Sequence, residues 1–209
     1  MKKLFTAIQK NDLDTVKELL DKTPSLIFST FKGSPKKFDG QSPLQVALKV
    51  ASNEMICLLL GYSPDVNFIE GEDCLNSWRA PVIHDAINRA IMESRWNVNR
   101  PDGIEVYNSE SESNDAFAIL ERIVEMGADV NAKDSYGNAC LNRACLQARQ
   151  ILPANGSNDR ILTEELRSDI LRIFNLLINH GADTGYISPN ASGRTIKEQY
   201  GNEILGEFI

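Results

Sequence analysis

The sequence predicts an all-α protein, a solenoid of about four helix pairs that ends in a capping unit. Four alanines each follow a large apolar residue by three positions, and four candidate helix exits lie downstream of them. The shortest alanine-to-exit spacing, 18 residues, and the shortest exit-to-alanine spacing, 15 residues, add up to a period of 33 residues. That period is typical of repeats built from a helix pair and a projecting turn. The alanines are Ala7, Ala47, Ala86 and Ala144, and the exits are Ser25, Asp65, Asp129 and Asp183.

Composition indicates one globular domain that spans residues 1–209. Hydrophobic residues make up 42% of the chain and charged residues 24%, which is usual for such a domain. Twenty-two basic residues stand against 29 acidic ones, for a net charge of −7. This acidity disfavours binding to nucleic acid and to anionic membranes, and it favours a basic protein partner.

The cysteines and the amino-terminal residues indicate a cytoplasmic protein. The first ten residues contain no apolar run of signal-peptide length, and no stretch is long enough to span a bilayer. The four cysteines form no CxxC pair, and only two histidines are present. We therefore expect a reducing compartment and neither a metal nor a cofactor.

The second helix pair shows the predicted pattern most clearly. Ser42 can cap an inner helix, and Pro43 can take its first position, where a missing amide proton costs nothing. Leu44 and Leu48 lie on one face of this helix, and the small Ala47 allows a neighbouring helix to approach. The outer helix places apolar residues at helical spacing: Met55, Ile56, Leu59 and Leu60.

Later segments carry a motif that is shared between repeats. Residues 124–131 read Val-Glu-Met-Gly-Ala-Asp-Val-Asn, and residues 180–183 read His-Gly-Ala-Asp. Gly137, Leu141 and Ala144 share a second spacing, and His84 precedes Ala86 by two positions. The chain thus resembles the ankyrin repeat family, with its D-x-x-G-x-T-P-L-H-x-A and L-L-x-x-G-A-D-V-N signatures, in the small stand-alone form common in bacteria. The resemblance implies repeats over about 1–37, 38–76, 77–134 and 135–190, with a carboxy-terminal cap over 191–209.

Several segments depart from the family pattern. Residues 23–25 replace the turn signature of repeat one, which resembles an amino-terminal cap. Ser63 stands where the family has glycine, and a left-handed serine costs roughly 1 kcal/mol. We therefore expect the outer helix of repeat two to end early, at Gly61. A degenerate last unit begins at residues 193–196 and ends in Ile204 and Phe208.

Repeats three and four are 25 and 21 residues longer than repeats one and two between their alanine and their exit. Both additions fall between the inner and the outer helix, so we expect them to form one continuous edge. Part of each should lengthen the helices: Ile87, Ala90, Ile91 and Trp96 in repeat three, and Leu162, Leu166 and Ile170 in repeat four. We expect the rest to be loop, with turn residues at 100–103, an acidic run over 105–112 and a second loop over 153–158.

Aromatic and basic residues in the projecting turns and at the inserted edge are the candidates for partner binding, because such residues are enriched at binding hot spots. The resemblance implies that the turn tips and the inner helices form a concave recognition face. Trp78 has two interpretations, since it can anchor a partner or fold back onto its own turn. The candidates are Phe31, Lys36, Lys37, Trp78, Arg79, Tyr136, Trp96 and Tyr107.

The sequence indicates a protein that is not an enzyme, because no phosphate-binding loop, metal cluster or nucleophile motif is present. We expect His84 to be a structural tether between turns, His180 to favour a helix carboxyl end, and Cys140 and Cys145 to pack in the core. The predicted function is non-catalytic protein binding by a monomer, as an inhibitor, an immunity-type protein or a regulatory binder. Two alternatives remain: a small-ligand receptor or enzyme that uses the edge near Trp96, Asp102 and Tyr107, and a self-associating scaffold.

Overall fold

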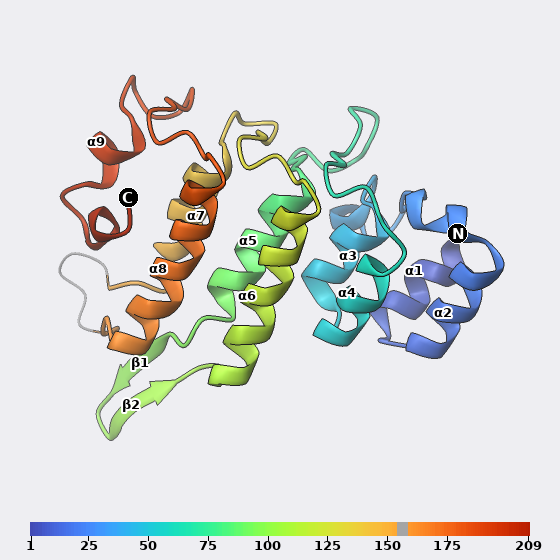
Figure 1. Ribbon diagram of the computed structural model, residues 1–209, viewed down its shortest axis with the longest axis horizontal. Coiled ribbons are helices and arrows are strands. Elements are labelled where there is room, and N and C mark those ends of the chain that lie inside the picture. Colours follow the sequence, from blue (N-terminus) through green and yellow to red (C-terminus); the bar gives the residue numbers. More distant parts are fainter. Residues whose placement is uncertain (154–158) are drawn as a thin grey trace.

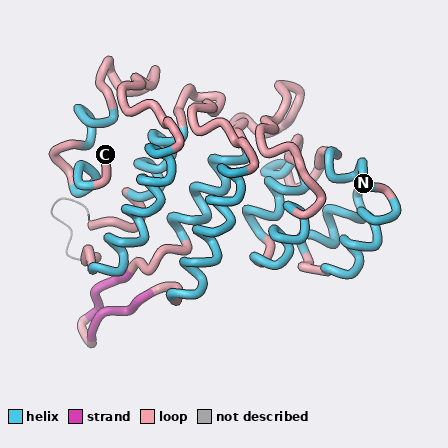
Figure 2. The backbone as a smooth tube through the Cα atoms, viewed as in Figure 1, coloured by secondary structure: helices cyan, strands magenta, loops and turns pink. Residues whose placement is uncertain are grey.

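A computed structural model describes residues 1–153 and 159–209, which are mostly helical with one two-stranded sheet (Figures 1 and 2). The helices are α1 Lys2–Gln9, α2 Leu13–Lys22, α3 Pro43–Val50, α4 Asn53–Leu60, α5 Val82–Met92, α6 Glu110–Glu125, α7 Cys140–Ala148, α8 Glu164–Asn179 and α9 Ile196–Tyr200. Short 3₁₀ helices lie at Pro24–Phe28, Lys36–Phe38 and Ile204–Glu207. The strands are β1 Asn97–Arg100 and β2 Gly103–Val106, which pair antiparallel.

The helices pack in two rows along the long axis of the molecule (Figure 1). α1, α3, α5 and α7 form one row, in which each helix contacts the next. α2, α4, α6 and α8 form the other row, and each of them packs against the preceding helix of the first row. Long loops leave one end of the rows, and the β1–β2 hairpin leaves the other end (Figure 1).

The helices begin where their capping residues predict. Ser42 Oγ accepts a hydrogen bond from the Gln45 amide at 3.2 Å, and Gln45 Oε1 accepts one from the Ser42 amide at 3.0 Å. This reciprocal pair satisfies two amides at the start of α3, and Pro43 occupies the first turn. Ser52 and Thr163 cap α4 and α8 through their hydroxyl groups.

Asparagines join successive loops at the ends of the helices. Asn67 Nδ2 donates to the Gly127 carbonyl at 2.9 Å, and its Oδ1 accepts from the Asp129 amide at 2.8 Å. Asn131 makes the same two contacts with the following loop, also at 2.9 and 2.8 Å. Each asparagine therefore satisfies backbone groups of a neighbouring loop and fixes the spacing between the loops.

The expectation for Ser63 is half right. α4 ends at Leu60 with Gly61 as its cap, close to the predicted end. Ser63 nevertheless has a φ of +52°, in the left-handed region that the prediction avoided. Its amide donates to the Leu60 carbonyl at 3.3 Å, and the next residue, Pro64, is buried. Burial of the proline and this hydrogen bond offset the local backbone strain.

The addition to the third helix pair is more ordered than predicted. α5 ends at Met92, so the expectation that Trp96 continues this helix is wrong. The expected loop contains the β1–β2 hairpin, and the acidic run over 105–112 includes part of β2 and the first turn of α6. Ser109 caps α6, and acidic side chains in a first turn are favoured by the helix dipole.

The addition to the fourth pair contributes to α8 as expected. Leu166 and Ile170 lie within this helix and are fully buried, whereas Leu162 precedes it. Of the second predicted loop, residues 154–158 lie outside the described residues.

The core lies between the two rows, where apolar side chains of successive helices meet. At the carboxy-terminal end, the rings of Phe174 and Phe208 lie 5.9 Å apart, so the last segment closes the end of the core as predicted. No helix in the described part of the chain is both long and apolar enough to cross a membrane.

We predict that Ile123→Ala lowers the free energy of unfolding by roughly 2–5 kcal/mol, because the side chain is fully buried in α6 and its truncation leaves a cavity. Denaturant unfolding measures the change. Glu121→Ala, on the exposed face of the same helix, is the control and should shift stability by about 0.5 kcal/mol at most. Equal effects of the two substitutions would contradict the observed burial.

Candidate functional site

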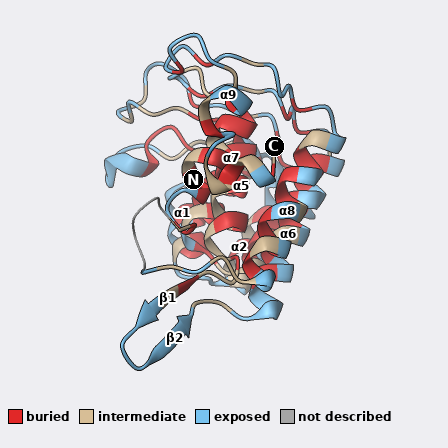
Figure 3. Cartoon of the chain, turned by 90° about the vertical axis from the view of Figure 1, so that its left-hand side faces the viewer, coloured by how far each residue is buried: buried red, intermediate tan, exposed pale blue. Residues whose placement is uncertain are grey.

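The loops bend over the row formed by α3, α5 and α7, on the side opposite α6 and α8 (Figure 3). A groove of about 300 Å³ lies where the loop that carries Trp78 meets α3 and α5. A second hollow of about 250 Å³ lies further along, where Tyr136 and residues 188–191 meet α7 and α9. We call these two hollows and the side chains around them the concave surface. The first groove is lined by Leu48, Lys49, Trp78, Asp85, Asn88, Arg89, Met92 and Glu93.

Trp78 folds back onto its own protein, which decides between its two interpretations. Its indole Nε1 donates to Asp134 Oδ2 at 3.1 Å. Lys49 Nζ lies 5.7 Å from the ring centroid, and the Arg143 guanidinium carbon lies 5.5 Å from it. Both cations are within the range of cation–π attraction. The tryptophan is thus a fixed wall of the groove that links two loops to α3 and α7.

A buried ion pair forms part of the groove. Lys49 Nζ donates to Asp85 Oδ2 at 2.5 Å, and the Asp85 side chain is 1% exposed. Burial raises the pKa of Asp85, and the positive charge of Lys49 opposes that shift. Asn88 Oδ1 is also buried, and it has no hydrogen-bond partner within the described residues. The groove therefore contains an unused acceptor beside a fixed ion pair.

Arg89 closes the carboxyl end of α3. Its Nη1 donates to the carbonyls of Leu48 and Ala51 at 3.2 and 3.0 Å. Nη2 lies 2.8 Å from Glu93 Oε1, and the guanidinium also donates to Asn53. Backbone and side-chain partners thus hold the arginine in place, and the groove has a preformed shape.

His84 is a structural tether, as predicted. It is fully buried, and its Nε2 lies 3.1 Å from the Ala132 carbonyl oxygen. Burial lowers the pKa of His84 to about 4, so the ring is neutral at pH 7. His180 is the carboxy-terminal cap of α8, and its Nδ1 lies 2.8 Å from the Leu176 carbonyl oxygen, as expected for a helix end.

The inserted edge brings together Trp96 and Tyr107. Their rings are stacked in parallel, with centroids 4.1 Å apart. The Arg160 guanidinium carbon lies 5.6 Å from the Trp96 ring centroid, and Arg100 Nη2 donates to Tyr107 Oη at 3.5 Å. The two additions also meet, because Asn97 exchanges hydrogen bonds with the backbone of Ile161 at 2.7 and 2.9 Å. In the described residues, the predicted common edge is therefore present.

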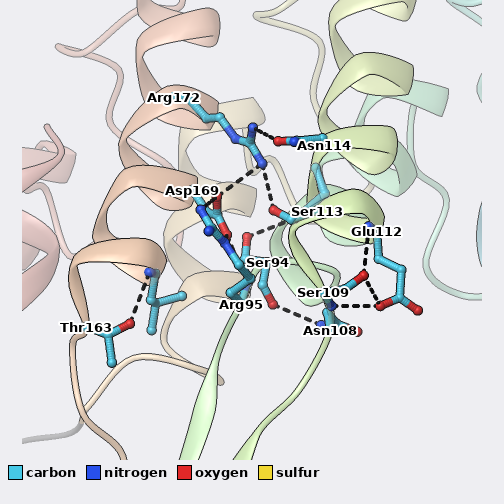
Figure 4. A network of polar contacts seen from close by, with 12 residues as sticks. Ser94, Arg95, Asn108, Ser109, Glu112, Ser113, Asn114, Thr163, Asp169 and Arg172 are labelled. Atoms are coloured by element: carbon cyan, nitrogen blue, oxygen red, sulfur yellow. Dashed lines mark hydrogen bonds and ion pairs between the residues drawn. The ribbon is translucent and has the colours of Figure 1, made fainter.

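A buried carboxylate fastens the base of this edge to α8 (Figure 4). Asp169, 1% exposed, accepts hydrogen bonds from the backbone N, Nε and Nη2 of Arg95 at 3.0, 2.9 and 2.9 Å. Arg172 Nη2 lies 3.1 Å from Asp169 Oδ1 and donates to Ser113 Oγ of α6. Burial alone would raise the pKa of Asp169, but the Arg95 hydrogen bonds and the Arg172 charge outweigh burial and lower it.

The remaining predicted binding residues differ in their exposure. Phe31 is half-buried, with its ring edge-on to Phe5 at 5.3 Å and to Phe38 at 6.0 Å, so the expectation that it contacts a partner is wrong. Lys36 and Lys37 are exposed on a short 3₁₀ helix.

Arg79 and Tyr136 lie at the rim of the concave surface. The backbone of Arg79 exchanges hydrogen bonds with Ser135 at 2.8 and 3.1 Å, which joins two loop tips. Tyr136 is 52% exposed and lines the second hollow. Of the predicted residues in the loops, Tyr136 has the exposure that a partner contact requires.

The sequence analysis missed the charged residues that build these surfaces. Asp169 lies on the apolar face of α8 between Leu166 and Ile173, and Asp85 lies among the buried residues of α5. A carboxylate within an apolar stripe is itself a signal for a buried partner, because unpaired burial of a charge is costly. The identity of each partner depends on tertiary contacts that no spacing reveals.

Cys140 and Cys145 are buried in α7, which confirms their predicted place in the core. Across residues 1–153 and 159–209, no cluster of three or more His, Cys, Asp or Glu side chains could hold a metal ion. Comparison with known proteins finds no family model that matches the chain and no matching curated protein.

We predict that Asp169→Ala lowers the free energy of unfolding by about 3 kcal/mol, because it leaves two part-buried guanidiniums without their shared carboxylate. Denaturant unfolding measures the loss, and near-UV circular dichroism of the Trp96–Tyr107 stack reports on the hairpin base. Asp115→Ala, exposed on α6, should change stability by about 0.5 kcal/mol at most. A loss no larger than this control would show that the pair does not hold the edge.

The low pKa of His84 predicts a pH dependence of stability. Below the ordinary value of 6.5 the unfolded chain binds the proton first, so stability falls between pH 6.5 and about 4. The shift of about 2.5 pKa units corresponds to about 3 kcal/mol at pH 4. Between pH 7 and 4, the wild type should therefore lose more unfolding free energy than His84→Gln by this amount. Comparing the two proteins cancels the contribution of the carboxylates, and parallel pH profiles would refute the assignment.

Proposed function

We propose that this chain is a non-catalytic protein-binding module of the ankyrin-repeat type, acting as an inhibitor or regulatory binder in the cytoplasm. The repeat assignment is supported by the two helix rows and by the identical asparagine contacts at Asn67 and Asn131. Such stacks bury their apolar faces against neighbouring repeats and leave a long surface for a partner. The free thiols of the four cysteines fit a reducing compartment.

The observation that carries the proposal is the prefixed concave surface. Trp78, Lys49 and Arg89 are each held by partners within the protein, so little side-chain entropy is lost when a partner docks. Asn88 Oδ1 offers an unused acceptor in the groove. A typical interface buries about 800 Å² on each partner, and two hollows along the same row of helices suit a contact of that extent.

Affinity capture from native lysate tests this proposal with three baits: the wild type, a Met92→Lys/Tyr136→Ala double variant and Glu121→Lys. The double variant alters both hollows, whereas Glu121 lies on the exposed face of α6. We expect one prey that the wild type and Glu121→Lys retain and the double variant loses. A hot-spot change costs about 2 kcal/mol or more, which is roughly a thirtyfold loss of affinity.

If the same prey binds all three baits equally, the concave surface is not the binding face. If purified protein captures no prey in any lysate of its natural host, the binding-module proposal fails.

A further inference from the structure

The β1–β2 hairpin has one covered edge and one open edge. The Tyr107 amide donates to the Trp96 carbonyl at 2.8 Å, so these opposed residues form a hydrogen-bonded pair. Such pairs alternate along an antiparallel ladder. In the observed register, Asn99 lies opposite Ile104 and Asn97 opposite Val106, and both are non-hydrogen-bonded pairs. The backbone groups of these four residues therefore point away from the hairpin.

The outward groups of β1 are used. The Asn99 amide donates to the Asp159 carbonyl at 2.7 Å, and the Asn97 side chain holds the backbone of Ile161. On β2, the amides of Ile104 and Val106 point to the opposite edge. Within residues 1–153 and 159–209, no chain segment lies along that edge to accept their hydrogen bonds.

The open edge also lacks the usual protection against strand pairing. Exposed edges commonly carry inward charges, proline or a bulge. β2 instead presents Ile104, 49% exposed, and Val106, 57% exposed, on one face. Figure 3 shows the hairpin projecting from the helices with exposed strands. The Asp169 network and the Trp96–Tyr107 stack hold its base, so the edge is ordered without a partner.

The surroundings of the edge are acidic. Residues 100–115 contain five acids and one arginine, Arg100, which is paired with Glu105 at 3.1 Å. All five acids are exposed: Asp102, Glu105, Glu110, Glu112 and Asp115. A second copy of the chain would bring the same negative charge to the edge, and like charges close together are destabilising. A basic segment would instead be attracted.

We propose that the open edge of β2 binds an extended basic segment of a partner protein by β-strand addition, with apolar side chains facing Ile104 and Val106 and lysine or arginine facing Glu105. Strand addition gains affinity from main-chain hydrogen bonds and specificity from alternate side chains. The inference deepens the proposed protein-binding function and rests on it, because it names a second contact surface and the chemistry of its occupant.

A short synthetic peptide that alternates valine and lysine is the probe. NMR-detected amide exchange of Ile104 and Val106 should slow about tenfold or more when the peptide is saturating, because both amides gain acceptors. A peptide that alternates valine and glutamate should give no slowing. A lysine peptide methylated on its valine nitrogens should also fail, because the valine opposite Ile104 in an antiparallel pair must use its own amide.

Two variants link the effect to the edge. Val106→Pro removes an outward amide and should weaken peptide binding about tenfold, since proline is tolerated at an edge strand but cannot donate. Val106→Thr keeps the amide and should bind like the wild type. Near-UV circular dichroism of the Trp96–Tyr107 stack confirms that each variant retains the hairpin.

Three results would overturn the inference: no slowing at Ile104 and Val106, equal slowing with the glutamate peptide, or slowing that rises with protein concentration in the absence of peptide. The last result would assign the edge to a second copy of the chain. Met92→Lys/Tyr136→Ala should leave the peptide response unchanged. If the peptide response is absent while this double variant still loses a captured partner, the edge inference fails and the proposed function stands.

Discussion

The inserted edge depends on the burial of one carboxylate. Asp169 has three hydrogen bonds from Arg95 and an ion pair with Arg172, so a charge that would oppose folding if unpaired instead joins three segments. Arg95 lies between α5 and the hairpin, and Arg172 reaches α6 through Ser113. Because Asp169 lies on α8, the addition to the third helix pair is held by the fourth. Neither addition is a free loop.

This attachment explains why an addition of this length is ordered. A hairpin of two short strands is marginal in water by itself. Here the Trp96–Tyr107 stack lies at its base, and Asn97 connects β1 to the backbone of Ile161. The covered edge of β1 and the open edge of β2 follow from that attachment, because the second addition lies along one side of the hairpin.

The helix pairs could be predicted from the sequence because their signals are local. Ser42 and Pro43 define the start of a helix, and the spacing of Leu59 and Leu60 defines its buried face. The hairpin was missed because its stability comes from contacts with Asp169, more than 60 residues away in sequence. The acidic run was misassigned because Ser109 turns its acids into favourable first-turn residues of α6. Phe31 was misassigned because a turn position does not reveal that its ring packs against Phe5.

The same distinction applies to the binding surfaces. Tryptophan and arginine in loops are hot-spot residue types, yet Trp78 is held by Asp134 and thereby shapes a groove that exposes other atoms. The residues left free to meet a partner are less conspicuous in sequence: Tyr136 at the rim, the acceptor of Asn88, and the backbone amides of Ile104 and Val106. Backbone amides carry no residue-specific signal at all. An open strand edge becomes recognisable as a binding surface only when its register and the segment that covers its other side are known.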